Sequence, residues 1–132
     1  MVHYFIKTFG PKGTIINIIS LGASFTMPGL SSYSTSKLGV IKLGEYVDAE
    51  YPELRVFSVH PGIVAANEGR GMVNPAFTSF AKDPTILTGA LTTYLSTQKA
   101  DFLRGGFVSV NCKVLALNRV SATYLLFTRG HQ

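Results

Sequence analysis

The sequence predicts an α/β domain in which parallel strands are joined by right-handed helical crossovers. The prediction depends on three short β-rich runs, at 14–20, 54–64 and 107–111, and on the helical segments 32–51 and 84–97 that separate them. With 132 residues and 46% hydrophobic content, the chain can bury about two thirds of its unfolded surface as one domain of ordinary size.

The first half of the chain is predicted to contain a short helix, a strand and a long helix. Residues 1–9 form the tail of a helix that the "GPKG" turn ends. The run "TIINIIS" at 14–20 is β-branched and bounded by turn residues, as expected for a strand buried on both faces of a parallel sheet. The helix at 32–51 stops at Pro52. Apolar residues recur along it at close to the helical period: Leu38, Ile41, Tyr46 and Ala49.

The second half is predicted to contain a strand, a long loop, a helix and a third strand. "LRVFSVHPGIV" at 54–64 is β-rich and is stopped by Pro61 and Gly62. After the loop, Asp83 as cap and Pro84 at the first helical position predict a helix over "PTILTGALTTYLST". The tail at 112–132 has no clear cap or turn and is expected to form a weak helix or strand outside the domain, which covers residues 1–111.

Composition argues against several functional classes. The net charge of +5 comes from twelve scattered Lys and Arg residues with no basic stripe, so nucleic-acid binding is not expected. A single cysteine, Cys112, cannot form an internal disulfide, and no Cys/His cluster has zinc-ligand spacing, so we expect no metal and a cytoplasmic location. No run of about eighteen apolar residues indicates a membrane span or signal peptide.

Tyr33 and Lys37 stand four residues apart in "SSYSTSKLG" at the start of the long helix. Residues at i and i+4 share one helix face, so the phenol and the ammonium can lie close together. A fixed cation favours the phenolate form of a tyrosine and so assists proton exchange near neutral pH. Ser20 ends the first strand, where open parallel sheets bind ligands. The three groups suit proton transfer at a carbonyl or alcohol oxygen, with Tyr as acid/base, Lys as electrostatic tuner and Ser as orienter.

"GTIINIIS", "YSTSK" and "VHPGIV", in this order, resemble the catalytic half of the short-chain dehydrogenase/reductase family. The resemblance covers residues 1–111 and implies a Rossmann-type doubly wound fold whose fifth, sixth and seventh strands are the three predicted here. It implies hydride transfer between NAD or NADP and a carbonyl or secondary alcohol. The implied catalytic residues are Ser20, Tyr33 and Lys37, and the implied cofactor-binding residues are Tyr33, Lys37, Pro61, Gly62 and Ile63.

The Gly-rich strand, turn and helix that receive the cofactor's pyrophosphate in this family are not found in the sequence. We therefore expect a partial fold, truncated at its N-terminus, that does not bind the cofactor competently or turn over alone. Such a fold exposes the edge of strand 14–20. Pairing with a full-length relative or homo-oligomerisation through the helix at 32–51, a dimer-forming element in the family, would cover apolar surface.

Two alternative functions use other features of the chain. A non-catalytic interaction protein would use the helix face or the open strand edge to bind a full-length relative. A serine hydrolase would use Ser34 as nucleophile and Lys37 as base, because "STSK" fits an S-x-x-K pattern, but the partner strings S-D-N and K-T-G do not occur. His60 is interpreted as a packing or loop-bonding residue rather than a base. "KADFLRGGFVSVN" resembles reductases of fungal secondary metabolism.

Overall fold

The computed structural model describes residues 2–65 and 79–111 and contains a three-stranded sheet in the order β1-β2-β3. The strands are β1 (Gly13–Ile18), β2 (Leu54–His60) and β3 (Phe107–Ser109), and both pairings are parallel. Gly13 pairs with Leu54 at one end of the first ladder, and His60 pairs with Ser109 at the end of the second. The prediction of three parallel strands is therefore confirmed.

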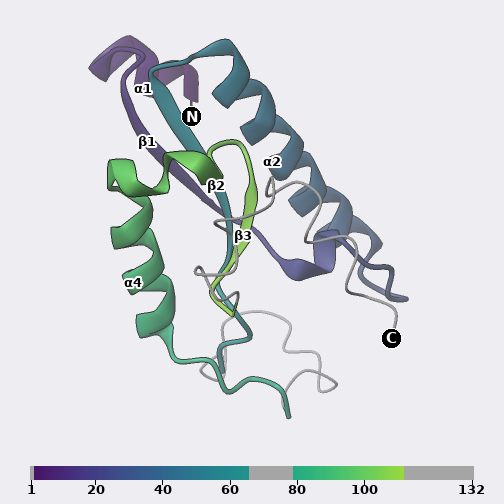
Figure 1. Ribbon diagram of the computed structural model, residues 1–132. Coiled ribbons are helices and arrows are strands. Elements are labelled where there is room, and N and C mark those ends of the chain that lie inside the picture. The colour runs from purple at the N-terminus through teal and green to yellow at the C-terminus, as the bar shows by residue number, and fades with distance from the viewer. Residues whose placement is uncertain (1, 66–78, 112–132) are drawn as a thin grey trace.

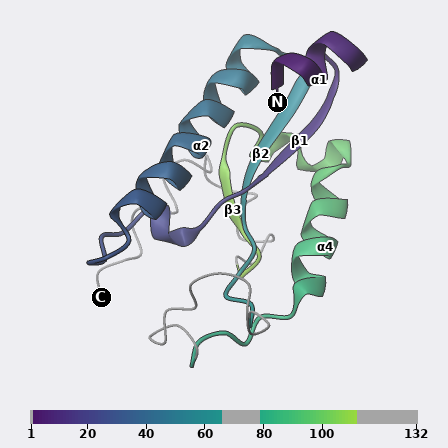
Figure 2. The same ribbon diagram turned by 180° about the vertical axis from the view of Figure 1, so that it is seen from behind.

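Helices cover both faces of this sheet. Helix α2 (Ser31–Glu50) lies on one face and α4 (Thr85–Leu95) on the other, as Figures 1 and 2 show from opposite sides. The short helix α1 (Val2–Phe9) precedes β1, and two 3-10 helices, η1 (Leu21–Ala23) and η2 (Gln98–Leu103), complete the described elements. In the part of the chain that the structure describes, no helix combines the length and apolar character that a membrane crossing requires.

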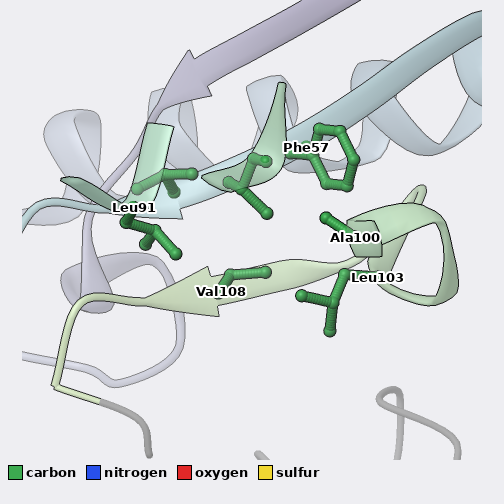
Figure 3. Close-up of a cluster of buried hydrophobic side chains, with 7 residues drawn as sticks. Phe57, Leu91, Ala100, Leu103 and Val108 are labelled. Atoms are coloured by element: carbon green, nitrogen blue, oxygen red, sulfur yellow. The ribbon is translucent and has the colours of Figure 1, made fainter. Parts of the chain in front are cut away.

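The main hydrophobic core lies between the sheet and α4. Phe57 and Val59 point to this side of β2, because alternate residues of a strand face opposite ways. Figure 3 shows side chains of the strands, α4 and η2 meeting in this layer. The buried members of the cluster are Phe57, Val59, Leu91, Leu95, Ala100, Leu103 and Val108.

Helix α2 packs against the opposite face at Gly44, which is buried. A Cβ on Gly44 would lie 3.1 Å from Asn17 Nδ2 and 3.3 Å from Ser58 Oγ, so the missing side chain allows the helix to approach the strands closely. The apolar repeat predicted from the sequence is therefore not the packing face. Leu38 and Tyr46 are 52% and 60% exposed, and α2 buries Gly44 and Val47 instead.

The start of α4 differs from the prediction. The helix begins at Thr85, and Pro84 is the cap residue without any side-chain cap bond. The carboxylate of Asp83, predicted to cap the helix, accepts a hydrogen bond from the backbone of Ile63 instead. The capping prediction is wrong because a partner distant in sequence takes the carboxylate. The tail at 112–132, and the part of the long loop at 66–78, lie outside the described residues.

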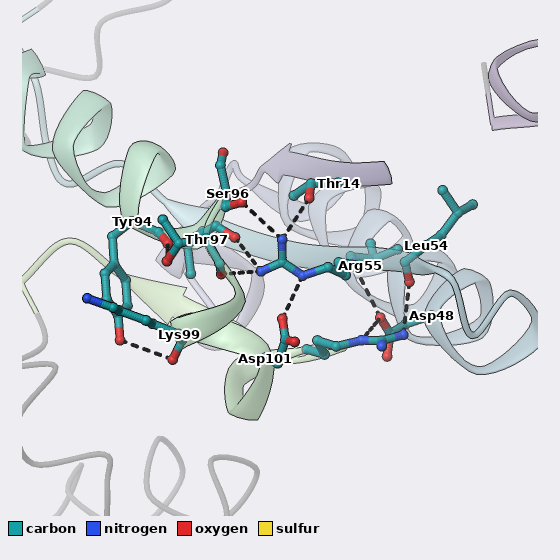
Figure 4. A network of polar contacts seen from close by, with 12 residues as sticks. Thr14, Asp48, Leu54, Arg55, Tyr94, Ser96, Thr97, Lys99 and Asp101 are labelled. Atoms are coloured by element: carbon teal, nitrogen blue, oxygen red, sulfur yellow. Dashed lines mark hydrogen bonds and ion pairs between the residues drawn. The ribbon is translucent and has the colours of Figure 1, made fainter. Parts of the chain in front are cut away.

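Arg55 connects the sheet to the end of α4 (Figure 4). Its Nε donates to Asp101 Oδ1 at 2.6 Å, and its Nη1 donates to Thr14 Oγ1 at 3.1 Å. The guanidinium also donates to the carbonyls of Leu95 and Ser96, which an α-helix leaves unpaired at its C-terminus. A further bond goes to the carbonyl of Thr97, the cap residue of η2, which also accepts the Ala100 N–H. One planar side chain thus satisfies acceptors from three elements.

Replacing Arg55 by Met should lower the free energy of unfolding by about 1–3 kcal/mol, because several carbonyl acceptors lose their donor together. Lys42→Met removes the same charge from a side chain that is 63% exposed and should cost less than about 1 kcal/mol. Urea unfolding of both variants measures the difference. Equal losses would contradict a structural role for the Arg55 contacts.

Candidate active site

The carboxyl ends of the three parallel strands lie at the same end of the sheet, and the predicted site residues Ser20 and Pro61 follow two of them. Ser20 lies two residues beyond β1, Pro61 directly follows β2, and Asn111 lies two residues beyond β3. The backbone N–H of Ile19 donates to the Val59 carbonyl at 2.9 Å, so the segments of β1 and β2 stay paired until just before Ser20. Open parallel sheets bind their ligands at this edge.

Ser20 is the cap residue of η1. Its backbone is extended, with φ −138° and ψ 145°, and its Oγ accepts the Gly22 N–H at 3.1 Å. This bond uses a lone pair of the hydroxyl and leaves the O–H as a donor. The turn therefore holds the Ser20 oxygen in place and leaves it able to donate to a substrate oxygen.

Tyr33 lies beside this turn in the first turn of α2. A Cβ built on Gly22 would lie 3.3 Å from Ser20 Oγ, 3.8 Å from Tyr33 Cε1 and 3.9 Å from Ser34 Oγ. The hydroxyl of Ser20 and the ring edge of Tyr33 are thus neighbours across a buried glycine. Tyr33 is 45% exposed, so a molecule arriving from solvent can reach it.

Lys37 joins α2 to the end of β1. Its Nζ donates to the Ile18 carbonyl at 3.1 Å and lies 5.8 Å from the centroid of the Tyr33 ring. The carbonyl bond restrains a long side chain that would otherwise sample many rotamers. The structure therefore brings Ser20, Tyr33 and Lys37 to one place, where a fixed positive charge stands next to the phenol ring.

The turn after β2 requires a glycine. Gly62 has φ +81°, a conformation that favours glycine, and a Cβ there would lie 2.6 Å from Asp83 Oδ2. Ile63, the next residue, donates its N–H to that same Asp83 oxygen at 2.7 Å and accepts the Asp83 N–H at 3.1 Å. Thr88 Oγ1 donates to the Pro61 carbonyl at 3.1 Å. The start of α4 thus fixes the turn from both sides.

The sequence did not predict that Asp83 binds the turn after β2. The Ile63 N–H and then the Asn111 side-chain amide stabilise its charged form and lower the pKa of the carboxyl. The Asp-Pro pair predicts a helix start, and no local pattern connects Asp83 to a turn twenty residues earlier. Only its position beside a Pro-Gly turn in space indicates the contact.

His60, the last residue of β2, is buried, and its Nδ1 accepts the Leu21 N–H at 3.2 Å. The expectation of a loop-bonding residue is confirmed by this contact. Burial lowers the pKa of the imidazole, and the nearby Asp83 carboxylate opposes this effect.

The family model for short chain dehydrogenases matches residues 1–74. The chain therefore belongs to the short-chain dehydrogenase family, and the resemblance stated from its motifs is confirmed.

Two relatives and one solved structure illustrate the match. "Short chain dehydrogenase mpl6" of Monascus purpureus is 30% identical over 110 residues, which are 82% of this chain and 37% of that protein. "Short chain dehydrogenase andI" of Emericella variicolor is 34% identical over 103 residues, which are 76% of this chain and 35% of that protein. The crystal structure of a gluconate 5-dehydrogenase from Burkholderia cenocepacia, in complex with NADP and tartrate, superposes with a TM-score of 0.65 at 19% identity.

This structural likeness covers 82% of the present chain and 46% of the gluconate 5-dehydrogenase chain. At that identity it shows the fold alone, and it confirms the prediction of a partial Rossmann-type domain. The chain spans less than half the length of these relatives.

Gly62→Ala should destabilise the protein more than Gly29→Ala, although both glycines have nearly the same positive φ. Each alanine costs about 1–2 kcal/mol of backbone strain. At Gly62 the new Cβ also collides with Asp83, which should add about 1–3 kcal/mol, whereas Gly29 has nothing within 4 Å. Chemical denaturation measures both losses, and a smaller loss at Gly62 would refute the tight packing of this turn.

Proposed function

We propose that this chain is the catalytic portion of an NAD- or NADP-dependent oxidoreductase that interconverts a carbonyl and a secondary alcohol. The observation that supports the proposal best is the convergence of Ser20, Tyr33 and Lys37 beside Gly22 in a member of the short-chain dehydrogenase family. We expect the substrate to be a small molecule and the protein to act in the cytoplasm, with no nucleic-acid or membrane partner. The resemblance of the segment at 99–111 to reductases of secondary metabolism favours a substrate from such a pathway.

In the reduction direction, the Tyr33 phenol would donate a proton to the carbonyl oxygen of the substrate. The Ser20 O–H would donate a hydrogen bond to that same oxygen and hold it near the phenol. The Lys37 cation would stabilise the phenolate that remains after transfer. Reduced nicotinamide, when bound, supplies the hydride that the carbonyl carbon receives, and oxidation reverses both transfers.

The described residues fit one half of a dinucleotide. Tyr33 and Lys37 offer a hydroxyl and an ammonium suited to ribose hydroxyls, and the half-buried turn at 61–63 has no side chain at Gly62. Lys37 would have to leave the Ile18 carbonyl, or share its donors, to bind a ribose. A Gly-rich turn leading from a strand into a helix, the usual pyrophosphate site, is not among the described elements.

A non-catalytic interaction protein remains the second candidate, and the surface of the structure favours it. In the described part of the chain β1 has a strand on one side only. Leu38, Leu43 and Tyr46 of α2 are each more than half exposed. Homo-oligomerisation, or pairing with a full-length relative, would cover this edge and this helix face.

We expect the purified 132-residue chain not to bind NADH or NADPH in the micromolar range. Two missing charge-assisted contacts to the pyrophosphate weaken binding by roughly a hundredfold to tens of thousandfold. Fluorescence titration measures this directly. Micromolar binding of either nucleotide would show that the chain forms a complete cofactor site.

The role of Tyr33 is best tested in a longer protein that includes this chain and a Gly-rich strand, turn and helix encoded upstream, if the genomic sequence contains one. Tyr33→Phe should reduce hydride transfer with a panel of secondary alcohols at least about a hundredfold, because the proton donor is lost. Tyr46→Phe removes a hydroxyl from a more exposed tyrosine of the same helix and should leave the rate unchanged. Equal rates in wild type and Tyr33→Phe would exclude Tyr33 as acid/base. If the variant then still binds a full-length relative as the wild type does, the result favours the interaction protein.

A further inference from the structure

His60 stands between the two turns that form the candidate active site. It is the last residue of β2, it directly precedes Pro61, and it is 6% exposed. Its backbone carbonyl accepts the Val110 N–H at 3.1 Å, which fixes the main chain of the residue in the sheet. The imidazole therefore has a defined place beneath the turn that carries Ser20.

The His60 imidazole accepts a backbone N–H just beyond the point where the pairing of β1 and β2 stops. The last ladder bond between the first two strands runs from the Ile19 N–H to the Val59 carbonyl. Two residues later the chain has turned into η1, and the Leu21 N–H finds its acceptor in His60 Nδ1 at 3.2 Å. A backbone N–H that is removed from water needs an acceptor, because an unpaired N–H costs about as much free energy as a lost hydrogen bond.

We propose that His60 is a positioning residue of the active site, whose neutral imidazole holds the Ser20 turn against the Pro61–Gly62 turn. The proposal rests on the proposed function in one respect, namely that the Ser20 hydroxyl orients the substrate. Ser20 Oγ is bound by Gly22 N–H, and Leu21 lies between these two residues, so His60 acts on the hydroxyl through one peptide unit.

This contact requires one protonation state. Nδ1 accepts a hydrogen bond only when it carries no proton, so the neutral ring has its proton on Nε2. The titratable residues of the segments around this end of the described sheet include Lys82 and Asp83 before α4 and Tyr33 and Lys37 on α2, while η1 and β3 carry none. Of these, Asp83 acts on the His60 ring through its charge. Asp83 favours the charged ring, but burial has the larger effect and lowers the pKa of His60.

The sign of the pH effect follows from that direction. The folded-state pKa lies below the ordinary value of 6.5, so the unfolded chain takes up the proton first as the pH falls. The stabilising contribution of neutral His60 is complete above pH 6.5 and declines as the pH drops toward the folded-state pKa. The Leu21 bond should break only when the folded ring itself takes up the proton, around the lower folded-state pKa.

Amide hydrogen exchange and NMR of the 132-residue chain test the proposal, with His60→Asn and His60→Leu as paired variants. The Asn Oδ1 can replace Nδ1 as acceptor, whereas Leu fills the space without one. In His60→Leu the Leu21 amide should lose protection on the order of tenfold, the effect of one ordinary hydrogen bond. The Gly22 amide proton, which reports on Ser20 Oγ, should shift in the same variant, and His60→Asn should restore both signals.

The Ile19 amide serves as the internal control, because it donates to the backbone of Val59 and not to His60. Its protection should stay constant in all three proteins. Equal loss at Ile19 and Leu21 in both variants would show that His60 only supports the fold and would overturn the proposal. So would unchanged Leu21 protection and an unchanged Gly22 signal in His60→Leu.

A pH titration of the wild-type protein by NMR tests the proposal without requiring any variant to fold. As the pH falls below 6.5, the Gly22 signal should move with the titration of the His60 ring. Titration of His60 without a response at Gly22 would refute the coupling. Neither readout needs cofactor or turnover, so a failure of the oxidoreductase proposal, seen with Tyr33→Phe, is distinguishable from a failure of this one.

Discussion

The parallel pairing of β1, β2 and β3 is the constraint on which the candidate site depends. Because all three strands run the same way, their carboxyl ends meet at one edge, and the residues that follow them become neighbours. Ser20, the Pro61–Gly62 turn and Asn111 reach this edge from segments that are far apart in the chain. An antiparallel arrangement of the same strands would have separated them.

The close approach of α2 to the sheet adds the second half of the site. Gly44 lets the helix axis lie near β1 and β2, and the amino end of the same helix carries Tyr33 and Lys37. The bond from Lys37 to the Ile18 carbonyl then fixes that end of the helix relative to β1. The packing of Gly44 against the sheet and the place of Tyr33 and Lys37 in the candidate site therefore both follow from the position of this one helix.

Asp83 and His60 share a function as links between segments. Asp83 connects the start of α4 to Ile63 on the turn after β2, and His60 connects the end of β2 to the turn after β1. Both side chains are engaged through specific protonation states, and the Asp83 carboxylate also acts on the His60 ring. The Ser20 hydroxyl proposed to orient the substrate and the turn at 61–63 proposed to bind the cofactor therefore belong to one hydrogen-bonded unit that acid would weaken.

The sequence by itself determined the three strands and the two long helices, because β-branched runs and prolines are local signals that act whatever the rest of the chain does. The candidate catalytic residues were predicted from the order of the motifs that resemble the family, since the four-residue spacing of Tyr33 and Lys37 is common on helices. Only the tertiary structure decided which face of α2 is buried, what Asp83 binds and which donor His60 receives. These contacts join residues 20 and 39 positions apart, so they depend on strand order and register, which local periodicity does not encode.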